Sequence, residues 1–141
     1  MRRLIFLDTG ALMALFNDRD RNHEAAVLFK NGLGSSAKYV MTNYILDELY
    51  TLGLKNIGHR ATVAMKREIV AVMDQKIIAL IWVTPEIADH AWSVFEKYNV
   101  DKSWSFTDCV SYSVMKQIGI NEAFTFDHHF SQMGFDRAPA D

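Results

Sequence analysis

The sequence predicts an α/β protein in which a parallel central sheet lies between two layers of helices, as a three-layer α/β/α sandwich. Four short apolar runs, rich in β-branched and aromatic residues, have the composition of strands that are buried on both faces. Stretches with helical spacing of apolar residues separate these runs. Strands that alternate with helices in this way form parallel sheets connected by right-handed crossovers.

The predicted elements follow one another without a linker, an internal repeat or a low-complexity tract. The strands are expected at residues 3–8, 38–42, 76–83 and 122–127. The helices are expected at residues 9–16, 21–31, 43–56, 59–74, 85–95 and 105–118.

Residues at the predicted helix ends support these boundaries. The second helix is expected to stop at Asn31, next to a glycine, and Asn43 is a plausible cap for the third. Thr84 can cap the fifth helix, with Pro85 at its first position, and Gly119 closes the sixth.

Length and composition are those of one ordinary globular domain, expected to span residues 1–141. Hydrophobic residues make up 50% of the chain and charged residues 23%, so the chain can bury a full core. No apolar run approaches the roughly 18 residues of a membrane span, so no membrane association is expected. The single cysteine, Cys109, excludes an internal disulfide framework and favours a reducing, cytoplasmic location.

The overall charge does not decide between function classes. A net charge of −2 and a pI of about 6.2 exclude a protein that coats nucleic acid by bulk electrostatics. A nucleic-acid enzyme remains compatible with this charge if bound cations and a local basic patch supply the attraction.

Four acidic residues are expected at one edge of the sheet. Asp8 and Asp127 directly end two predicted strands, Glu48 lies in the second turn of a helix, and Asp108 lies in the first turn of another. Parallel sheets bind ligands at the carboxyl ends of their strands, so these side chains should converge there. Clustered carboxylates repel one another and favour a bound cation, and an all-oxygen set suits Mg²⁺ or Mn²⁺. Such ions support hydrolysis of phosphodiesters.

Each acid also has a simpler interpretation. Asp8 and Asp127 could cap the helical turns that follow them, Asp108 could complete a capping box with Ser105, and Glu48 could be a solvated helix position. Four such coincidences at one edge are harder to accept together than singly.

Four segments of the chain, in this order, resemble the signature segments of PIN-domain ribonucleases, in particular the small VapC-like proteins. These segments are "FLDTGALMALF", "TNYILDELYTL", "SFTDCVSYSVMKQIG" and "AFTFDHHFSQMGF", and the similarity runs from about Leu4 to Phe135. Asn43 departs from the small or hydroxyl-bearing residue usual in relatives, a change that a helix cap tolerates.

The resemblance implies a PIN-like fold and a divalent-metal-dependent endoribonuclease that uses Mg²⁺ or Mn²⁺ to activate a water for in-line attack. It implies that Asp8, Glu48 and Asp108 hold one metal and that Asp127 completes the site, with Thr9, Thr107 and Thr125 in support. It also implies an RNA substrate, a cognate antitoxin protein as partner, and a homodimer with the apolar early helices as candidate surfaces.

Several other residues have more than one interpretation. His128 and His129 are interpreted as bystanders rather than metal ligands, although one of them could contact phosphate when protonated. Trp104 is more readily explained by packing than by stacking on an unpaired base. A solvated helix surface explains the basic residues after Glu48 better than a phosphate-guiding face does. These basic residues are Lys55, Arg60, Lys66 and Arg67.

Other functions fit the sequence less well. Aspartyl-phosphate phosphatases need a second acid two positions after the nucleophile, where this chain has Gly10, and a phospho-receiver domain needs an acid pair after its first strand. A housekeeping RNA-processing nuclease and a non-catalytic domain that binds RNA or protein remain as alternatives to a toxin.

Overall fold

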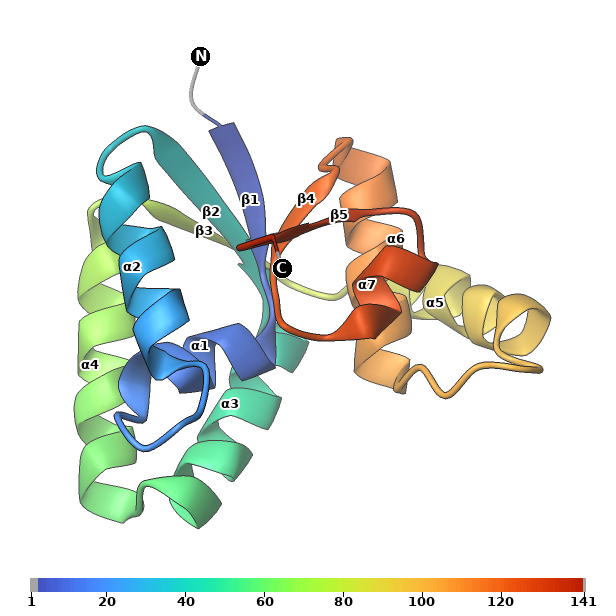
Figure 1. Ribbon diagram of the computed structural model, residues 1–141. Coiled ribbons are helices and arrows are strands. Elements are labelled where there is room, and N and C mark those ends of the chain that lie inside the picture. The colour runs from blue at the N-terminus through green and yellow to red at the C-terminus, as the bar shows by residue number, and fades with distance from the viewer. Residues whose placement is uncertain (1–2, 141) are drawn as a thin grey trace.

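Residues 3–140 are described by a computed structural model, and they form five strands and seven helices (Figure 1). The strands are β1 (Arg3–Leu7), β2 (Ala37–Thr42), β3 (Ile78–Ile81), β4 (Glu122–Phe124) and β5 (Asp136–Ala138). The helices are α1 (Thr9–Phe16), α2 (His23–Leu33), α3 (Asn43–Asn56), α4 (His59–Asp74), α5 (Pro85–Tyr98), α6 (Phe106–Ile118) and α7 (His128–Gln132). No helix in this range is both long enough and apolar enough to cross a bilayer.

All strand pairings are parallel, and the strand order is β3-β2-β1-β4-β5, which confirms the predicted sheet. The chain leaves β1 first toward β2 and β3, and later returns on the other side of β1 to form β4 and β5. The carboxyl ends of β1 and β4 therefore form the switch point of the sheet, where proteins of this architecture bind ligands.

Helices cover both faces of the sheet, as predicted. Helices α1, α2 and α4 lie on one side, and α5 and α6 pack against each other on the opposite side (Figure 1). Buried apolar side chains of β1 and β4, including Ile5, Phe6 and Phe124, fill the space between the layers. This core fixes the ends of the two central strands.

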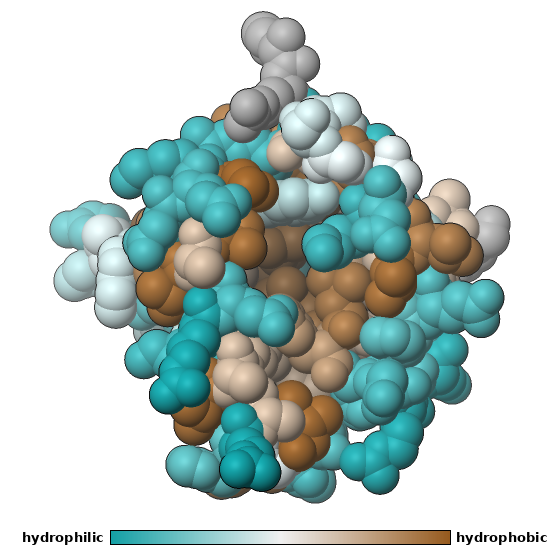
Figure 2. All heavy atoms as spheres, turned by 90° about the vertical axis from the view of Figure 1, so that its left-hand side faces the viewer, coloured by the Kyte–Doolittle hydropathy of each residue, from teal (hydrophilic) through white to brown (hydrophobic). Residues whose placement is uncertain are grey.

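One side of the molecule has an apolar hollow of about 580 Å³. Figure 2 shows the hydrophobic surface gathered there, on the side that bears α2 and α4. Its walls include Leu15 of α1, Val27 and Phe29 of α2, and Val72 of α4. The apolar early helices expected as candidate dimer surfaces thus contribute to this hollow, and the dimer itself stays a prediction.

Three strands are shorter than predicted: β1 by one residue, and β3 and β4 by more. The backbone of Lys76 has a φ of +63°, which belongs to a turn, and Val83 N donates to the side chain of Asn43 rather than to a strand. After Phe124 the chain leaves the ladder, so Asp127 lies three positions beyond β4 instead of directly at its end.

Helices α2, α5 and α6 differ from their predicted bounds, α6 by beginning one residue later, at Phe106, and helix α3 differs in its cap. Helix α2 begins two residues later and continues to Leu33, which is buried, before Gly34 ends it with a φ of +52°. Helix α5 continues to Tyr98. Helix α3 is capped by Thr42 and not by Asn43, because Thr42 Oγ1 accepts a hydrogen bond from Ile45 N at 3.2 Å.

Strand β5 was not predicted. Its three residues, Asp136, Arg137 and Ala138, have little strand propensity of their own. Backbone pairing with β4 forms it, and this pairing extends to a hydrogen bond from Thr125 N to Ala138 O. An edge strand of this kind depends on the rest of the sheet.

We expect the cap at Thr42 to contribute measurably to stability. Thr42→Val keeps the shape of this fully buried side chain but removes its oxygen, so Ile45 N loses its partner. Loss of such a cap costs about 1 kcal/mol, measurable as a lower free energy of unfolding in urea. A free energy of unfolding equal to that of the wild type would contradict the assignment of Thr42 as the cap of α3.

Candidate active site

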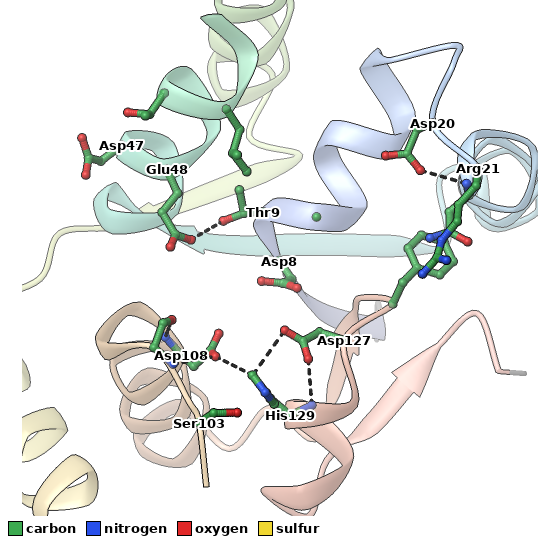
Figure 3. Close-up of a pocket in the computed structure, with 16 residues that line it drawn as sticks. Asp8, Thr9, Asp20, Arg21, Asp47, Glu48, Ser103, Asp108, Asp127 and His129 are labelled. Carbon is green, nitrogen blue, oxygen red and sulfur yellow. Dashed lines mark hydrogen bonds and ion pairs between the residues drawn. The ribbon is translucent and has the colours of Figure 1, made fainter. Parts of the chain in front are cut away.

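The four predicted acids converge on one open cavity of about 960 Å³. Figure 3 shows Asp8, Glu48, Asp108 and Asp127 around it, supplied by the end of β1, by α3, by the start of α6 and by the turn before α7. This is the convergence that the strand-end positions predict.

Asp8 is the most enclosed of the acids. Its side chain accepts a hydrogen bond from Thr125 Oγ1 at 2.7 Å and makes no capping bond to α1, so the interpretation of Asp8 as a simple helix cap is wrong. The residue is only 8% exposed, and burial raises its pKa from 3.8 to about 7. The Thr125 bond opposes this rise, and the charges of Asp108 and Asp127 add to it.

Glu48 is half-buried and faces the cavity from α3. Its Oε1 accepts a hydrogen bond from Thr9 Oγ1 at 2.8 Å, and the side chain of Thr107 lies near enough to lower its pKa. Burial is the main cause of its raised pKa, the two hydroxyls oppose the rise, and the charge of Asp108 adds to it. Asp47, the neighbour of Glu48 in the chain, is exposed and also lines this cavity.

Asp108 both caps helix α6 and faces the cavity. Its Oδ2 accepts from Ser105 N at 3.0 Å while Ser105 Oγ accepts from Asp108 N, which completes the capping box of α6. The same Oδ2 lies 2.9 Å from His129 Nδ1. The cap therefore aims this carboxylate at the cavity and does not exclude a role there.

His129 lies in the site, which contradicts its interpretation as a bystander. Its ring contacts Asp108 and also lies 3.4 Å from Asp127 Oδ2, while Asp127 Oδ1 accepts from His129 N at 2.9 Å and so caps α7. Ligand atoms of Asp108, Asp127 and His129 lie within 4.8 Å of one another. His128 is exposed and does not line the cavity.

Two other interpretations from the sequence can be judged directly. Trp104 is buried, at 6% exposure, and its Nε1 donates to Gln132 Oε1, so it packs and cannot stack on a base. The four basic residues after Glu48 are all absent from the cavity lining within residues 3–140, which agrees with a solvated helix surface. Cys109 is fully buried, and burial raises the pKa of its thiol to about 11.

Sequence reasoning missed part of the cavity wall. Arg21 and Asn22, from the connection between α1 and α2, line it, as does Ser103 from the loop before α6. Arg21 was expected inside a helix, and nothing in its local sequence indicates that it lines the same cavity as Asp108, far along the chain.

The donor set fits a hard divalent cation. The site has four carboxylates and one imidazole, that of His129, and the hydrogen-bond donors that hold Asp8 and Glu48 are neutral hydroxyls, so negative charge remains to be neutralised. Burial, and after it the charges of Asp108 and Asp127, raises the pKa of Asp8, and a bound cation would stabilise the charged carboxylate against both. Mg²⁺ and Mn²⁺ prefer oxygen ligands of this kind.

An oxygen-lined acidic site at the switch point of a parallel sheet defines a class of α/β proteins suited to phosphate chemistry with divalent metals. A family model described as "PIN domain" matches residues 5–136. The chain therefore belongs to the PIN-domain family, and the proteins it is similar to are VapC-like.

Two of these relatives show how far the similarity extends. A "23S rRNA-specific endonuclease VapC20" of Mycobacterium tuberculosis is 35% identical over 133 residues, which cover 94% of this chain and 95% of that protein. A "VapC ribonuclease" of Archaeoglobus fulgidus is 24% identical over 127 residues, covering 89% of this chain and 78% of that protein.

Solved structures agree with this family. The crystal structure of Mycobacterium tuberculosis VapC20, described as a Sarcin-Ricin loop cleaving toxin, has a TM-score of 0.81 at 30% identity and covers 93% of this chain and 95% of its own. VapBC2 of Rickettsia felis, bound to a DNA fragment from its promoter, has a TM-score of 0.69 at 10% identity, covering 95% and 96%. The second match supports the fold alone.

The raised pKa of Asp8 predicts how stability depends on pH without metal. The folded state keeps the proton up to about pH 7, whereas the unfolded chain releases it near 3.8, so stability falls as pH rises through this window. In EDTA, we expect the wild type to lose free energy of unfolding between about pH 5 and about pH 7.5, by at most about 1.4 kcal/mol per pH unit from this group.

Asp8→Asn should flatten this dependence, because its amide does not titrate. Asp47→Asn, which changes an exposed acid on the same cavity, is the control and should keep the wild-type slope. Urea unfolding at the two pH values measures the effect. If the free energy of unfolding changes with pH equally in Asp8→Asn and in the wild type, Asp8 does not titrate in this pH range.

Proposed function

We propose that this protein is a divalent-metal-dependent endoribonuclease that hydrolyses RNA phosphodiester bonds and acts as the toxin of a toxin–antitoxin pair. The observation that carries the proposal is the convergence of Asp8, Glu48, Asp108 and Asp127 on one cavity at the switch point of the sheet. The VapC-like relatives support RNA as the substrate class.

In this proposal the four acids hold Mg²⁺ or Mn²⁺. When bound, such an ion activates a water and stabilises negative charge on phosphate oxygens. The protein's own contribution is to fix the carboxylates: Thr125 orients Asp8, Thr9 orients Glu48, with Thr107 proposed to support it, and the capping box with Ser105 orients Asp108. Catalytic geometry of this kind depends on such supporting contacts.

His129 is proposed as a positioning residue between two of these acids. Its Nδ1 lies against Asp108 Oδ2, and its backbone N–H holds Asp127, so one residue joins the α6 and α7 sides of the site. This contact keeps the two carboxylates at a fixed separation before a cation binds.

The relatives also indicate partners and a substrate. One relative is named for cleavage of 23S rRNA, and we propose ribosomal RNA as the first substrate to test and a cytoplasmic location with it. A cognate antitoxin and a homodimer complete the proposal. A housekeeping RNA-processing role is the other candidate, and a small antitoxin gene beside the gene for this chain would favour the toxin.

The central test is Asp108→Asn, which keeps an oxygen for Ser105 N but removes the charge. We expect cleavage of ribosomal RNA by the wild type with Mg²⁺ or Mn²⁺, none in EDTA, and a loss of at least about 100-fold in the variant, on the scale of losing one charged group from a catalytic site. End-sequencing of the products would give the cleavage site.

Asp101→Asn, an exposed acid of the loop before α6, serves as the matched control and should cleave normally. A second readout is melting temperature, which Mg²⁺ should raise in the wild type and raise less in Asp108→Asn. Cleavage by Asp108→Asn at the wild-type rate would refute the site assignment.

The two adjacent histidines provide an internal comparison. His129→Ala removes the contacts to Asp108 and Asp127 and should lower the cleavage rate about 10- to 100-fold, the usual cost of losing a residue that orients metal ligands. His128→Ala changes an exposed side chain and should cleave like the wild type. Equal rates for the two variants would exclude the positioning role, and each rate is measured at saturating Mg²⁺.

A further inference from the structure

The cavity extends well beyond the four acids. A cation with six waters, at about 30 Å³ per water, occupies on the order of 180 Å³. The cavity holds about 960 Å³, so most of it lies outside the space that the ion needs. One further wall comes from residues 17–22, the connection between α1 and α2, which places Arg21 and Asn22 on the lining (Figure 3).

This connection is an ordered turn. Asp20 N donates to Asn17 O at 3.0 Å, and Asn22 N donates to the side chain of Asp20 at 2.8 Å. His23 then ties the start of α2 to α1 through a 2.7 Å contact between its Nδ1 and Ala14 O. These contacts fix the backbone on both sides of Arg21.

The charge of Arg21 is available to a ligand. Its neighbour Asp20 accepts a hydrogen bond from Asn22 N, and within residues 3–140 Arg21 forms no ion pair with it or with any other acid. Among the lining residues within 3–140, Arg21 is the one side chain with a permanent positive charge, and the other possible cation, His129, lies against Asp108 and Asp127. Figure 3 shows Arg21 on the opposite side of the cavity from Asp108.

We propose that Arg21 is a substrate-binding residue that contacts a backbone phosphate next to the one held at the acids. A guanidinium binds a phosphate through two parallel hydrogen bonds, which fixes the position of a strand as well as attracting it. Contacts of this type position nucleic acid without reading its sequence. The inference rests on the proposed endoribonuclease function and assigns one wall of the same cavity to the flanking RNA.

The test measures RNA binding separately from cleavage. Fluorescence anisotropy of a labelled ribosomal RNA hairpin is followed in the Asp108→Asn background, with Mg²⁺ present, for Arg21→Gln and Arg21→Lys. We expect Kd to rise about 10-fold for Arg21→Gln and less for Arg21→Lys. The slope of log Kd against log salt should fall by about 1 for Arg21→Gln, as for one lost phosphate contact.

Arg19→Gln is the matched control. Arg19 is an exposed arginine of the same turn and does not line the cavity, so its removal changes net charge equally. This variant should bind RNA like its parent. The melting temperature and its rise with Mg²⁺ should be the same in all of these proteins.

Equal Kd and equal salt slope for Arg21→Gln and Arg19→Gln would overturn the assignment of Arg21, as would a parent that does not bind the RNA. Failure of the proposed function gives a different result, because the wild type would then show no metal-dependent cleavage whatever Arg21 contributes to binding.

Discussion

The burial and mutual repulsion of four carboxylates gathered at the switch point of the sheet is the constraint around which the rest of this structure is arranged. Asp8 is buried, and its pKa rises to about 7, first because burial disfavours its charge and further because of the charges of Asp108 and Asp127. A fold that aimed only at stability would place apolar or neutral groups here. The apolar core between the helix layers offsets the cost of this burial and repulsion and holds the strand ends rigid.

Neutral donors, more than cations, hold the acids in place. Thr125 and Thr9 donate hydroxyls to Asp8 and Glu48, and backbone N–H groups hold Asp108 and Asp127. A lysine or arginine in these positions would satisfy the carboxylates fully and compete with a divalent ion. Hydroxyls and helix caps fix the orientation of the carboxylates but leave most of their negative charge for the ion. A carboxylate can therefore cap a helix and still bind a metal.

The cavity divides into an acidic part and a wall that bears Arg21. A polyanionic strand needs both, because cations at the acids neutralise one phosphate while its neighbours still require positive charge. The net charge of −2 for the whole chain is then no obstacle to RNA binding, since attraction is local. The turn at residues 17–22 is important for RNA binding in this proposal, because it holds the positive charge of Arg21 in a defined place.

Much of the fold and most of the site could be predicted from the sequence, because strand composition, helix caps and the position of acids after strands are local signals. The parallel sheet and the convergence of Asp8, Glu48, Asp108 and Asp127 follow from these signals together with the geometry of parallel sheets. The capping box of α6 is also local.

Contacts between segments far apart in the chain were decided by the tertiary structure alone. Strand β5 exists because β4 pairs with it, His129 joins the site because α7 packs beside α6, and Trp104 is buried because Gln132 lies next to it. Arg21 lines the cavity because the turn between α1 and α2 is held in place, in part by the contact of His23 with Ala14. Local sequence carries no record of these neighbours, since each depends on how separate elements pack.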